Sequence, residues 1–210
     1  MLAVIQARLN SKRLKNKILH LINGKPLIWH VIKNVKKAKG VSKVVVATSN
    51  TKHDDRLAKY LKKIKVENFR GNLKNVAKRL LDTATYYNKK KIIRISGDSP
   101  LISSNIIDKL ININKKKKFK KYDLITNVFP RSYPKGHSVE ILKTSILKTY
   151  LNKMSQDETE HVTKYFYNNS RKFKIKNLRS LKDQKKVKLS VDTKEDMIKI
   201  KQILGIKKNP

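Results

Sequence analysis

Short runs of β-branched residues alternate with segments of helical periodicity along the first half of the chain. Residues 43–47, for example, have the sequence Lys-Val-Val-Val-Ala, and the segment that follows repeats apolar residues at Leu57, Ala58 and Leu61, which is typical of one helix face. The predicted strands of this half are residues 1–5, 43–47, 66–69 and 91–95, and the predicted helices are residues 27–39, 54–63 and 75–87. Strands joined by crossover helices predict an α/β fold with a largely parallel sheet covered on both faces.

The second half of the chain is less regular. Its predicted strands are residues 123–126, 139–142, 173–178 and 189–191, and its predicted helices are residues 104–115, 144–152, 160–168 and 194–204. We find no internal repeat and no linker rich in Pro, Gly or Ser. A chain of 210 residues has a length that suits one generous domain, so we predict a single domain over residues 1–210.

The chain carries a strong positive charge. It has 52 lysine and arginine residues against 15 aspartate and glutamate residues, a formal net charge of +37. Such an excess is compatible with nucleic-acid binding, because Lys and Arg neutralise phosphates. Only nine of the basic residues are arginine, however, and the lysines are spread along the whole chain, which indicates a general compositional bias. We expect no specific nucleic-acid partner, and we keep a basic nucleic-acid-binding protein as an alternative.

Cysteine is absent from the sequence, which excludes a disulfide framework, a thiol nucleophile and a thiolate metal site. Apolar runs are only a few residues long, too short for a helix that spans a membrane. The sequence begins directly on a predicted strand, without the layout of a signal peptide. We therefore expect a soluble, cytoplasmic protein.

Four polar segments follow predicted strands. They are residues 6–17, 48–50, 97–101 and 192–193. In an open parallel sheet, the loops at the carboxyl ends of the strands lie along one edge, and ligands bind there at the point where the strand order reverses. The four segments therefore predict one site assembled from distant parts of the chain.

The first of these loops contains Ser11, Arg13 and Lys17. A hydroxyl, a planar guanidinium and a compact ammonium together suit an extended polyphosphate. The loop is not a P-loop, because GxxxxGK[ST] is absent, and no GxGxxG follows the first strand. A basic loop of this kind also arises easily in so basic a chain, so a solvated surface loop is the alternative.

Two aspartates end predicted strands. Asp98 lies between Gly97 and a Ser-Pro turn, and Asp192 precedes a helix start at Thr193. Carboxylates are the hard oxygen ligands that Mg²⁺ takes together with substrate phosphates. An Asp that hydrogen-bonds its own turn is the alternative for Asp98. The acids that follow Thr193 suit the first turn of a helix, which leaves Asp192 available as a second metal ligand.

Several segments match the motifs of one enzyme family in the same order along the chain. They are Ala-Arg-Leu-Asn-Ser-Lys-Arg-Leu-Lys-Asn-Lys at 7–17, Gly-Lys-Pro-Leu-Ile at 24–28, Val-Val-Val-Ala-Thr-Ser at 44–49, Phe-Arg-Gly at 69–71, Gly-Asp-Ser-Pro-Leu at 97–101, Glu-His-Val-Thr at 160–163 and Val-Asp-Thr-Lys-Glu-Asp at 191–196. Together they resemble the CMP-sugar-acid cytidylyltransferases, which include acylneuraminate and 3-deoxy-manno-octulosonate cytidylyltransferases. Residues 160–163 are similar to the branch of the spore coat polysaccharide biosynthesis protein F.

The resemblance implies a three-layer nucleotide-diphospho-sugar transferase (GT-A-like) fold with a mostly parallel mixed sheet. It implies Mg²⁺-dependent transfer of CMP from CTP to a sugar acid, which releases pyrophosphate and gives a CMP-sugar for surface polysaccharide biosynthesis. Residues 1–102 are then the nucleotide-binding half, and residues 103–210 the sugar-binding and dimerisation half of a homodimer. A nucleotidyltransferase for another nucleotide or sugar is the alternative within the same fold, because a fold does not fix its substrate.

The resemblance also implies the roles of individual residues. The expected catalytic residues are Arg13, Lys17 and Asp98, and the expected metal ligands are Asp98 and Asp192. The expected nucleotide-binding residues are Ala7, Arg8, Ser11, Arg13, Lys17, Thr48 and Arg70.

Candidate substrate-binding residues lie in the second half: Arg131, Tyr133, Glu140 and His161. Arg131 and Tyr133 belong to a Pro-rich loop, and loops of this kind frequently carry specificity; a surface turn is the alternative. Glu140 is equally well explained as an ordinary strand carboxylate. For His161 we favour a structural role at a helix end over contact with substrate.

Two departures from the family pattern stand out. Lys15 and Asn16 occupy the positions where the family usually has Pro-Gly, and Ser138 stands where the branch commonly has an acid two residues before Glu140. Asn replaces Gly at positive φ more readily than other residues do. Asn16 can therefore take the place of the family's glycine, and a more flexible loop is the alternative.

Overall fold

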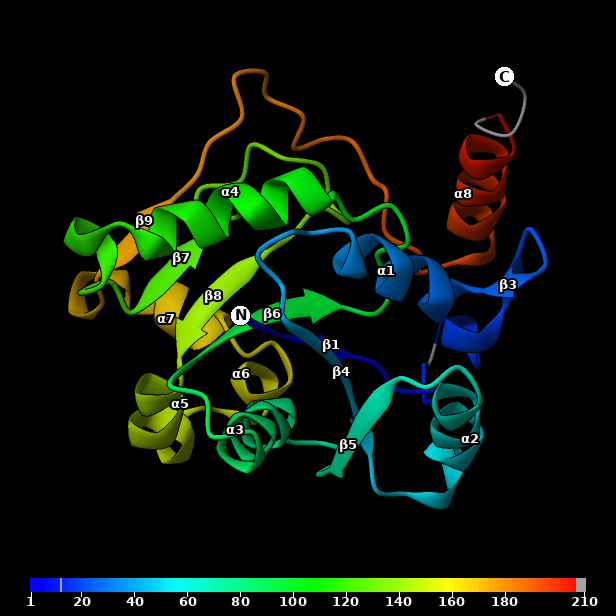
Figure 1. The fold of residues 1–210 in the computed structure, drawn as a ribbon, viewed down its shortest axis with the longest axis horizontal. Helices are drawn as coiled ribbons and strands as arrows, with labels where there is room; N and C mark the ends of the chain where they lie inside the picture. The colour runs from blue at the N-terminus through cyan, green and yellow to red at the C-terminus, as the bar shows by residue number, and fades with distance from the viewer. Residues whose placement is uncertain (12, 207–210) are drawn as a thin grey trace.

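The computed structural model describes residues 1–11 and 13–206, and Figure 1 shows its fold. The strands are β1 (Leu2–Gln6), β2 (Leu21–Ile22), β3 (Lys25–Pro26), β4 (Lys43–Ser49), β5 (Glu67–Gly71), β6 (Lys91–Ser96), β7 (Leu124–Thr126), β8 (Glu140–Lys143) and β9 (Ile175–Asn177). The α-helices are α1 (Leu27–Lys36), α2 (Asp55–Lys63), α3 (Val76–Tyr86), α4 (Ser104–Lys115), α5 (Thr144–Tyr150), α6 (Gln156–Glu160), α7 (Lys164–Asn168) and α8 (Lys194–Ile206).

Seven of the strands form one mixed sheet in the order β5-β4-β1-β6-β8-β7-β9. The first four strands in this order run parallel, as do β7 and β9, whereas β8 is antiparallel to both of its neighbours. The chain moves outward from β1 to β4 and β5 and then returns to place β6 on the other side of β1. The strand order therefore reverses between β1 and β6, which is where ligands bind in sheets of this type.

Helices cover both faces of this sheet (Figure 1). On β1, Ala3 and Ile5 belong to one apolar cluster, which also takes in residues of α1, α2, α4 and α8. The alternate residues Leu2 and Val4 belong to a second cluster, with residues of α3, α5 and α7. Because successive side chains of a strand point to opposite faces, the two clusters are the two interfaces of a three-layer α/β architecture. The predicted fold class is confirmed.

Two predicted elements of the second half are wrong. Residues 160–168 do not form one helix, because α6 begins early, at a capping box made by Ser155 and Glu158, and ends at His161 before α7 starts. Residues 189–191 do not form a strand. They run beside the loop before β8, where Leu189 N donates to Lys135 O (2.6 Å).

A short hairpin was also missed. Strands β2 and β3 pair antiparallel around Asn23 and Gly24, whose φ angles are 49° and 73°. Asn-Gly between two strands is the usual signal for a tight turn with positive φ at both central positions. The signal was present in the sequence, but strands of two residues are too short to show an alternation of apolar and polar side chains.

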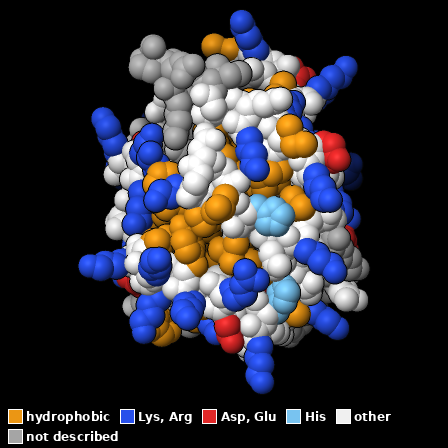
Figure 2. Space-filling model, turned by 90° about the vertical axis from the view of Figure 1, so that its right-hand side faces the viewer, with side chains coloured by type: hydrophobic (Ala, Val, Ile, Leu, Met, Phe, Trp, Pro, Cys, Tyr) orange, Lys and Arg blue, Asp and Glu red, His pale blue; other side chains and the backbone are white. Residues whose placement is uncertain are grey.

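Two further features of the structure are the length of its helices and the distribution of charge on its surface. None of the helices in the described ranges combines the length and the apolar character needed to cross a membrane. On the face shown in Figure 2, lysine and arginine side chains are dispersed around a central apolar area instead of gathering in one basic patch. On this face the distribution agrees with a compositional excess of lysine.

Gly136 provides a test of how the second half is packed. Its φ is +103°, and a Cβ built there would lie 2.6 Å from the carbonyl carbon of Leu189 and 2.7 Å from Ser190 N. We expect Gly136→Ala to lower the free energy of unfolding by about 2–4 kcal/mol, from backbone strain and overpacking. Urea unfolding measures the change.

The matched control is Gly205→Ala, because a Cβ at this helical glycine meets nothing within 4 Å. We expect that substitution to leave stability unchanged or raise it by about 0.5 kcal/mol. Equal destabilisation by the two substitutions would contradict the role of Gly136.

Candidate active site

The loops after β1 and β6 and the segment before α8 meet at the carboxyl edge of the sheet. They surround a cavity of about 640 Å³, called the edge cavity below. Of the residues predicted for the site, those that line it are Ala7, Arg8, Ser11, Arg13, Lys17, Asp98, His161 and Asp192. The structure thus brings together three of the four polar segments that the sequence placed at one edge.

The Lys17 ammonium lies between two carboxylates. Its Nζ is 3.6 Å from Asp98 Oδ2 and 3.1 Å from Asp192 Oδ1, and it donates to the backbone oxygen of Val191 (2.7 Å). Arg13 Nη2 also donates to Asp192 Oδ1, at 2.8 Å. Two aspartates from distant segments therefore converge beside the basic loop that follows β1.

Backbone contacts hold these two aspartates in place. Val191 N donates to Asp98 O (2.9 Å), which ties the segment before α8 to the loop after β6. The carboxylate of Asp196 accepts from the backbone N–H groups of Asp192 (2.8 Å) and Thr193 (3.0 Å). These bonds satisfy amide groups at the start of α8, and they fix the backbone from which the Asp192 side chain projects.

Surrounding cations keep Asp192 ionised. Burial raises the pKa of Asp192, but the positive charges of Lys17, Arg13 and Lys188 together lower it by more than burial raises it. The pKa of Asp192 therefore lies below its ordinary value of 3.8. Nearby positive charges favour the charged form of a carboxyl group. At neutral pH, Asp192 is therefore an anionic oxygen donor that faces the edge cavity.

The loop after β1 is fixed at its base. A buried carboxylate, Asp54, accepts from Leu9 N at 2.7 Å and from Ser49 N at 3.0 Å. Further along, Asn16 adopts the left-handed conformation (φ 56°, ψ 20°), which asparagine reaches more readily than most residues other than glycine. Sequence reasoning did not single out Asp54, which stands at the start of the helix predicted over residues 54–63.

Gly97 sets how closely the loops after β1 and β6 approach each other. A Cβ at this position would lie 2.8 Å from Ala7 Cβ and 2.9 Å from Gln6 O. Gly97 N donates to Gln6 O at 2.9 Å. The glycine therefore lets Asp98 leave β6 directly beside Ala7.

Two arginines form the wall of the edge cavity next to α3. Arg8 donates to Leu73 O (3.2 Å) and forms an ion pair with Glu160. Arg79 is only 1% exposed and donates to the backbone oxygens of Asn72 and Leu73. Burial, and then the nearby charge of Arg8, lower the pKa of Arg79 to about 10. The sequence carried a signal for Arg79, since an arginine on the apolar face of α3 breaks the pattern of that face.

Thr48 and Arg70 lie outside the lining of the edge cavity. Thr48 is fully buried in β4, and its hydroxyl has no hydrogen-bond partner among the described residues. Arg70 donates to Ser49 O (3.0 Å) and forms an ion pair with Asp55 (2.6 Å), so its guanidinium braces the loop before α2. We therefore leave both residues out of the proposed site, contrary to the prediction.

The predicted substrate-binding residues are dispersed. Glu140 is 2% exposed and pairs with Arg94 and Tyr167, which fits the alternative of a structural strand carboxylate. Arg131 donates to Ser138 Oγ (3.1 Å), and Tyr133 packs against the apolar cluster around α1 and α4. Of the four predicted residues, only His161 lines the edge cavity.

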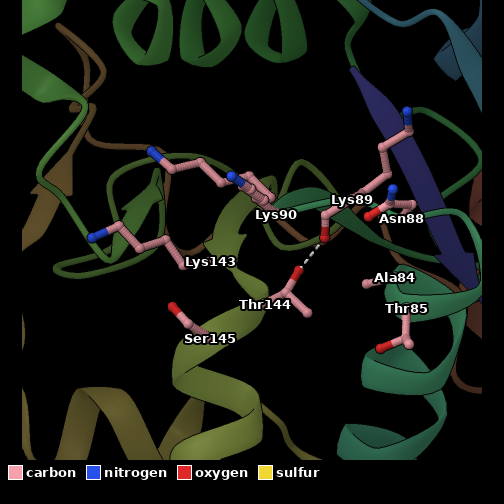
Figure 3. A pocket seen from close by; sticks show the side chains of 9 residues that line it. Ala84, Thr85, Asn88, Lys89, Lys90, Lys143, Thr144 and Ser145 are labelled. Atoms are coloured by element: carbon pink, nitrogen blue, oxygen red, sulfur yellow. Dashed lines mark hydrogen bonds between the residues drawn. The ribbon is translucent and has the colours of Figure 1, made fainter.

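A second cavity of about 650 Å³ lies between the end of α3 and the start of α5. Figure 3 shows its lysines, which include Lys89, Lys90 and Lys143, with their ammonium groups extending away from the centre of the cavity. None of the residues predicted for the site lines this cavity. The edge cavity is therefore the candidate active site.

The position of Lys17 between the two carboxylates leads to a testable prediction about the pKa of Asp192. We expect Lys17→Met to raise the pKa of Asp192, because the first of the cations that lower it is removed. Since the folded pKa lies below the unfolded value, ionised Asp192 adds stability above about pH 4 and loses it as the pH falls further. A ¹³C NMR titration of the Asp192 carboxyl group measures the shift.

Lys185→Met is the control, because Lys185 pairs with exposed Asp183 and is not among the cations that lower the pKa of Asp192. The control is expected to leave the titration of Asp192 unchanged. An unchanged pKa in Lys17→Met would show that the ammonium does not hold the two carboxylates together.

Known proteins with similar sequences match this chain over most or about half of its length. The chain is 32% identical to the uncharacterized protein MJ1063 of Methanocaldococcus jannaschii, over 93% of this chain and 79% of that protein. It is 27% identical to the spore coat polysaccharide biosynthesis protein SpsF of Bacillus subtilis, over 96% and 85%. It is 37% identical to the 3-deoxy-manno-octulosonate cytidylyltransferase 2 of Hydrogenovibrio crunogenus, over 51% of this chain and 44% of that enzyme.

Two solved structures superpose on nearly the whole of this chain. A cytidylyltransferase from Leptospira borgpetersenii superposes with a TM-score of 0.90 at 31% identity, over 98% of this chain and 87% of that chain. CMP:2-keto-3-deoxy-manno-octonic acid synthetase complexed with CTP superposes with a TM-score of 0.76 at 18% identity, over 98% and 99%, which shows the fold alone. The family model described as cytidylyltransferase matches residues 2–208. The chain therefore belongs to the cytidylyltransferase family and is a nucleotidyltransferase.

Proposed function

We propose that the chain transfers CMP from CTP to a sugar acid, with Mg²⁺ as cofactor, and releases pyrophosphate. The observation that carries the proposal is the convergence of Asp98 and Asp192 on Lys17, beside the basic loop after β1. Anionic ligands for a metal and cations for a triphosphate thus lie together in one cavity. Nucleotidyl transfer needs both kinds of group in one place.

The two carboxylates fit Mg²⁺. In the described part of the chain, no cluster of three or more His, Cys, Asp or Glu side chains is placed to hold a metal by itself. Two carboxylates are the usual protein share of a Mg²⁺ site whose other ligands are substrate phosphates and water. The Lys17 ammonium lies between Asp98 and Asp192, which supports the proposal that this point suits a cation.

The chain's own cations hold the triphosphate in the proposed reaction. Arg13 and Lys17 bind the β and γ phosphates, and Ala7, Arg8 and Ser11 line the nucleotide's part of the edge cavity. The sugar hydroxyl oxygen bonds to the α phosphorus, the bond from that phosphorus to the bridging oxygen breaks, and the hydroxyl proton passes to solvent. Bound Mg²⁺ supplies neutralisation of phosphate charge during this exchange. Asp98, Arg13 and Lys17 act by position and charge.

A sugar acid is the proposed acceptor because of the relatives. Several similar proteins are 3-deoxy-manno-octulosonate cytidylyltransferases, although the chain spans less than half of their length. SpsF, which the chain matches over most of its length, is a polysaccharide biosynthesis protein. We propose that the CMP-sugar serves surface polysaccharide synthesis, in keeping with the name of SpsF. A cytoplasmic location, a homodimer and the division into a nucleotide half and a sugar half stay predictions.

Pyrophosphate release tests the proposal. The wild-type chain is assayed with CTP, UTP, GTP or ATP, with and without Mg²⁺, against a panel of ulosonic acids. We expect turnover with CTP, and its loss when EDTA removes the metal. We expect Asp98→Asn and Asp192→Asn to lower kcat by about 100-fold or more, because each removes a charged metal ligand.

Asp183→Asn is the matched control, because Asp183 is exposed and pairs only with Lys185 among the described residues. Its activity is expected to stay within about threefold of wild type, as for other surface substitutions. Preference for another nucleotide, turnover in EDTA, or an Asp98→Asn variant as active as the control would each contradict the proposal.

A further inference from the structure

A row of polar side chains crosses the sheet next to the edge cavity, on the face covered by α3. It consists of Gln6 on β1, Arg94 on β6, Glu140 on β8 and Thr126 on β7, and is called the polar row below. Arg94 lies directly opposite Glu140 in the pairing of β6 with β8, and Glu140 lies opposite Thr126 in the pairing of β8 with β7. The row therefore runs from the nucleotide side of the sheet into the second half of the chain.

Arg94 is held on two sides within this row. Its Nε donates to Gln6 Oε1 at 2.8 Å, and its Nη1 pairs with Glu140 Oε2. Its Nη2 has no hydrogen-bond partner among the residues that the structure describes, and the side chain lines the edge cavity. A guanidinium fixed at two of its three nitrogens keeps the third, Nη2, to donate to an anion in a charge-assisted hydrogen bond.

Glu140 is itself held from behind. Tyr167 donates to Glu140 Oε1 at 2.6 Å, and its ring stacks on Phe129 with centroids 4.6 Å apart. Burial, and then the charge of Glu140, raise the pKa of Tyr167 well above its ordinary value, so the hydroxyl keeps its proton and donates. With Arg94 and Tyr167 as partners, the buried Glu140 carboxylate orients Arg94 and is itself shielded from an incoming anion.

The other arginines that line the edge cavity are committed elsewhere. Arg13 pairs with Asp192 and lies in the loop proposed to hold phosphates, and Arg8 pairs with Glu160. Arg79 is buried against backbone oxygens of the loop before α3. Because Arg13 and Arg8 are assigned to the nucleotide and Arg79 is buried, we assign the acceptor to Arg94, the remaining arginine of this lining.

The position of Arg94 fits the chemistry of the proposed acceptor. Arg94 and Ser96 lie on the same face of β6, two residues apart, and Asp98 lies two residues after the end of that strand. In a ulosonic acid, the anomeric hydroxyl that attacks the nucleotide sits on the same carbon as a substituent carboxylate. The carboxylate must therefore bind in the same cavity as Asp98, the proposed metal ligand, and Arg94 lines that cavity.

We propose that Arg94 is the residue that recognises the carboxylate of the acceptor, and that Gln6 and Glu140 are positioning residues that aim it. This inference rests on the proposed function, because it names how the sugar-acid acceptor is selected. A hydrogen-bonded charge pair in a partly buried site discriminates strongly against a neutral ligand. The enzyme is therefore expected to prefer the acid over an uncharged derivative of the same sugar.

The test compares two acceptors, 3-deoxy-manno-octulosonate and its neutral carboxamide, with saturating CTP. We expect Arg94→Gln to raise the KM for the acid by about 10- to 100-fold and to abolish the preference for acid over amide. The KM for CTP is expected to change by less than about threefold, since the triphosphate is bound by other cations. A merely structural role would weaken acid and amide alike.

Two further variants keep the test decisive. Arg94→Lys keeps the charge, guards against misfolding of Arg94→Gln, and is expected to retain a reduced preference for the acid, because lysine lacks the planar fork. Lys74→Gln removes one positive charge from an exposed residue that lines the same cavity, and it is expected to keep the full preference. Loss of preference in Lys74→Gln to the same extent would show a general charge effect and overturn the assignment.

The outcomes separate this inference from the proposed function. If the wild type uses no acid of the ulosonic acid panel with CTP, the proposed function fails and the role of Arg94 fails with it. If the wild type turns over the acid but Arg94→Gln and Arg94→Lys both keep the wild-type preference for acid over amide, only the role of Arg94 is overturned.

Discussion

The site depends on the Lys17 ammonium that separates two carboxylates. Asp98 and Asp192 come from distant segments, and two like charges this close repel each other strongly in a partly buried site. The ammonium lies 3.6 Å from one and 3.1 Å from the other, so it offsets that repulsion and marks the point where a cation is favoured. These charges support the proposed nucleotide chemistry at this edge of the sheet, because carboxylates that suit a metal lie beside cations that suit phosphates.

Backbone conformation brings these charges together. Asn16 turns the first loop through a left-handed conformation, Gly97 lets the loop after β6 pass against Ala7, and Gly136 lets the segment before Asp192 pass against the loop before β8. Each is a point where a larger side chain or a different φ would move a charged residue. The polar row extends the same construction across the sheet, since Arg94 is positioned by side chains on the two neighbouring strands.

Much of the fold and of the candidate site was predictable from the sequence. Buried parallel strands appear as short apolar runs between helical segments, and the loops that follow such strands lie at one edge of the sheet. Asp98, Asp192, Arg13 and Lys17 were found in this way. The second half was harder, since its helices are short and the segment at 189–191 is held by loop contacts. Arg79 and Arg94 were missed because the role of an arginine inside a helix or strand depends on its partners: Arg79 broke the apolar pattern of its helix face, but the backbone oxygens and the carboxylate that bind the two arginines are known only from the structure.

Anomalous diffraction from a crystal grown with Mn²⁺ and a non-hydrolysable CTP analogue tests the central claim most directly. Manganese takes the same oxygen ligands as magnesium, and its anomalous signal locates the ion without ambiguity. The account predicts a manganese ion bonded to carboxylate oxygens of both Asp98 and Asp192, with the triphosphate against Arg13 and Lys17. Manganese bound to the nucleotide with neither aspartate as a ligand would contradict it.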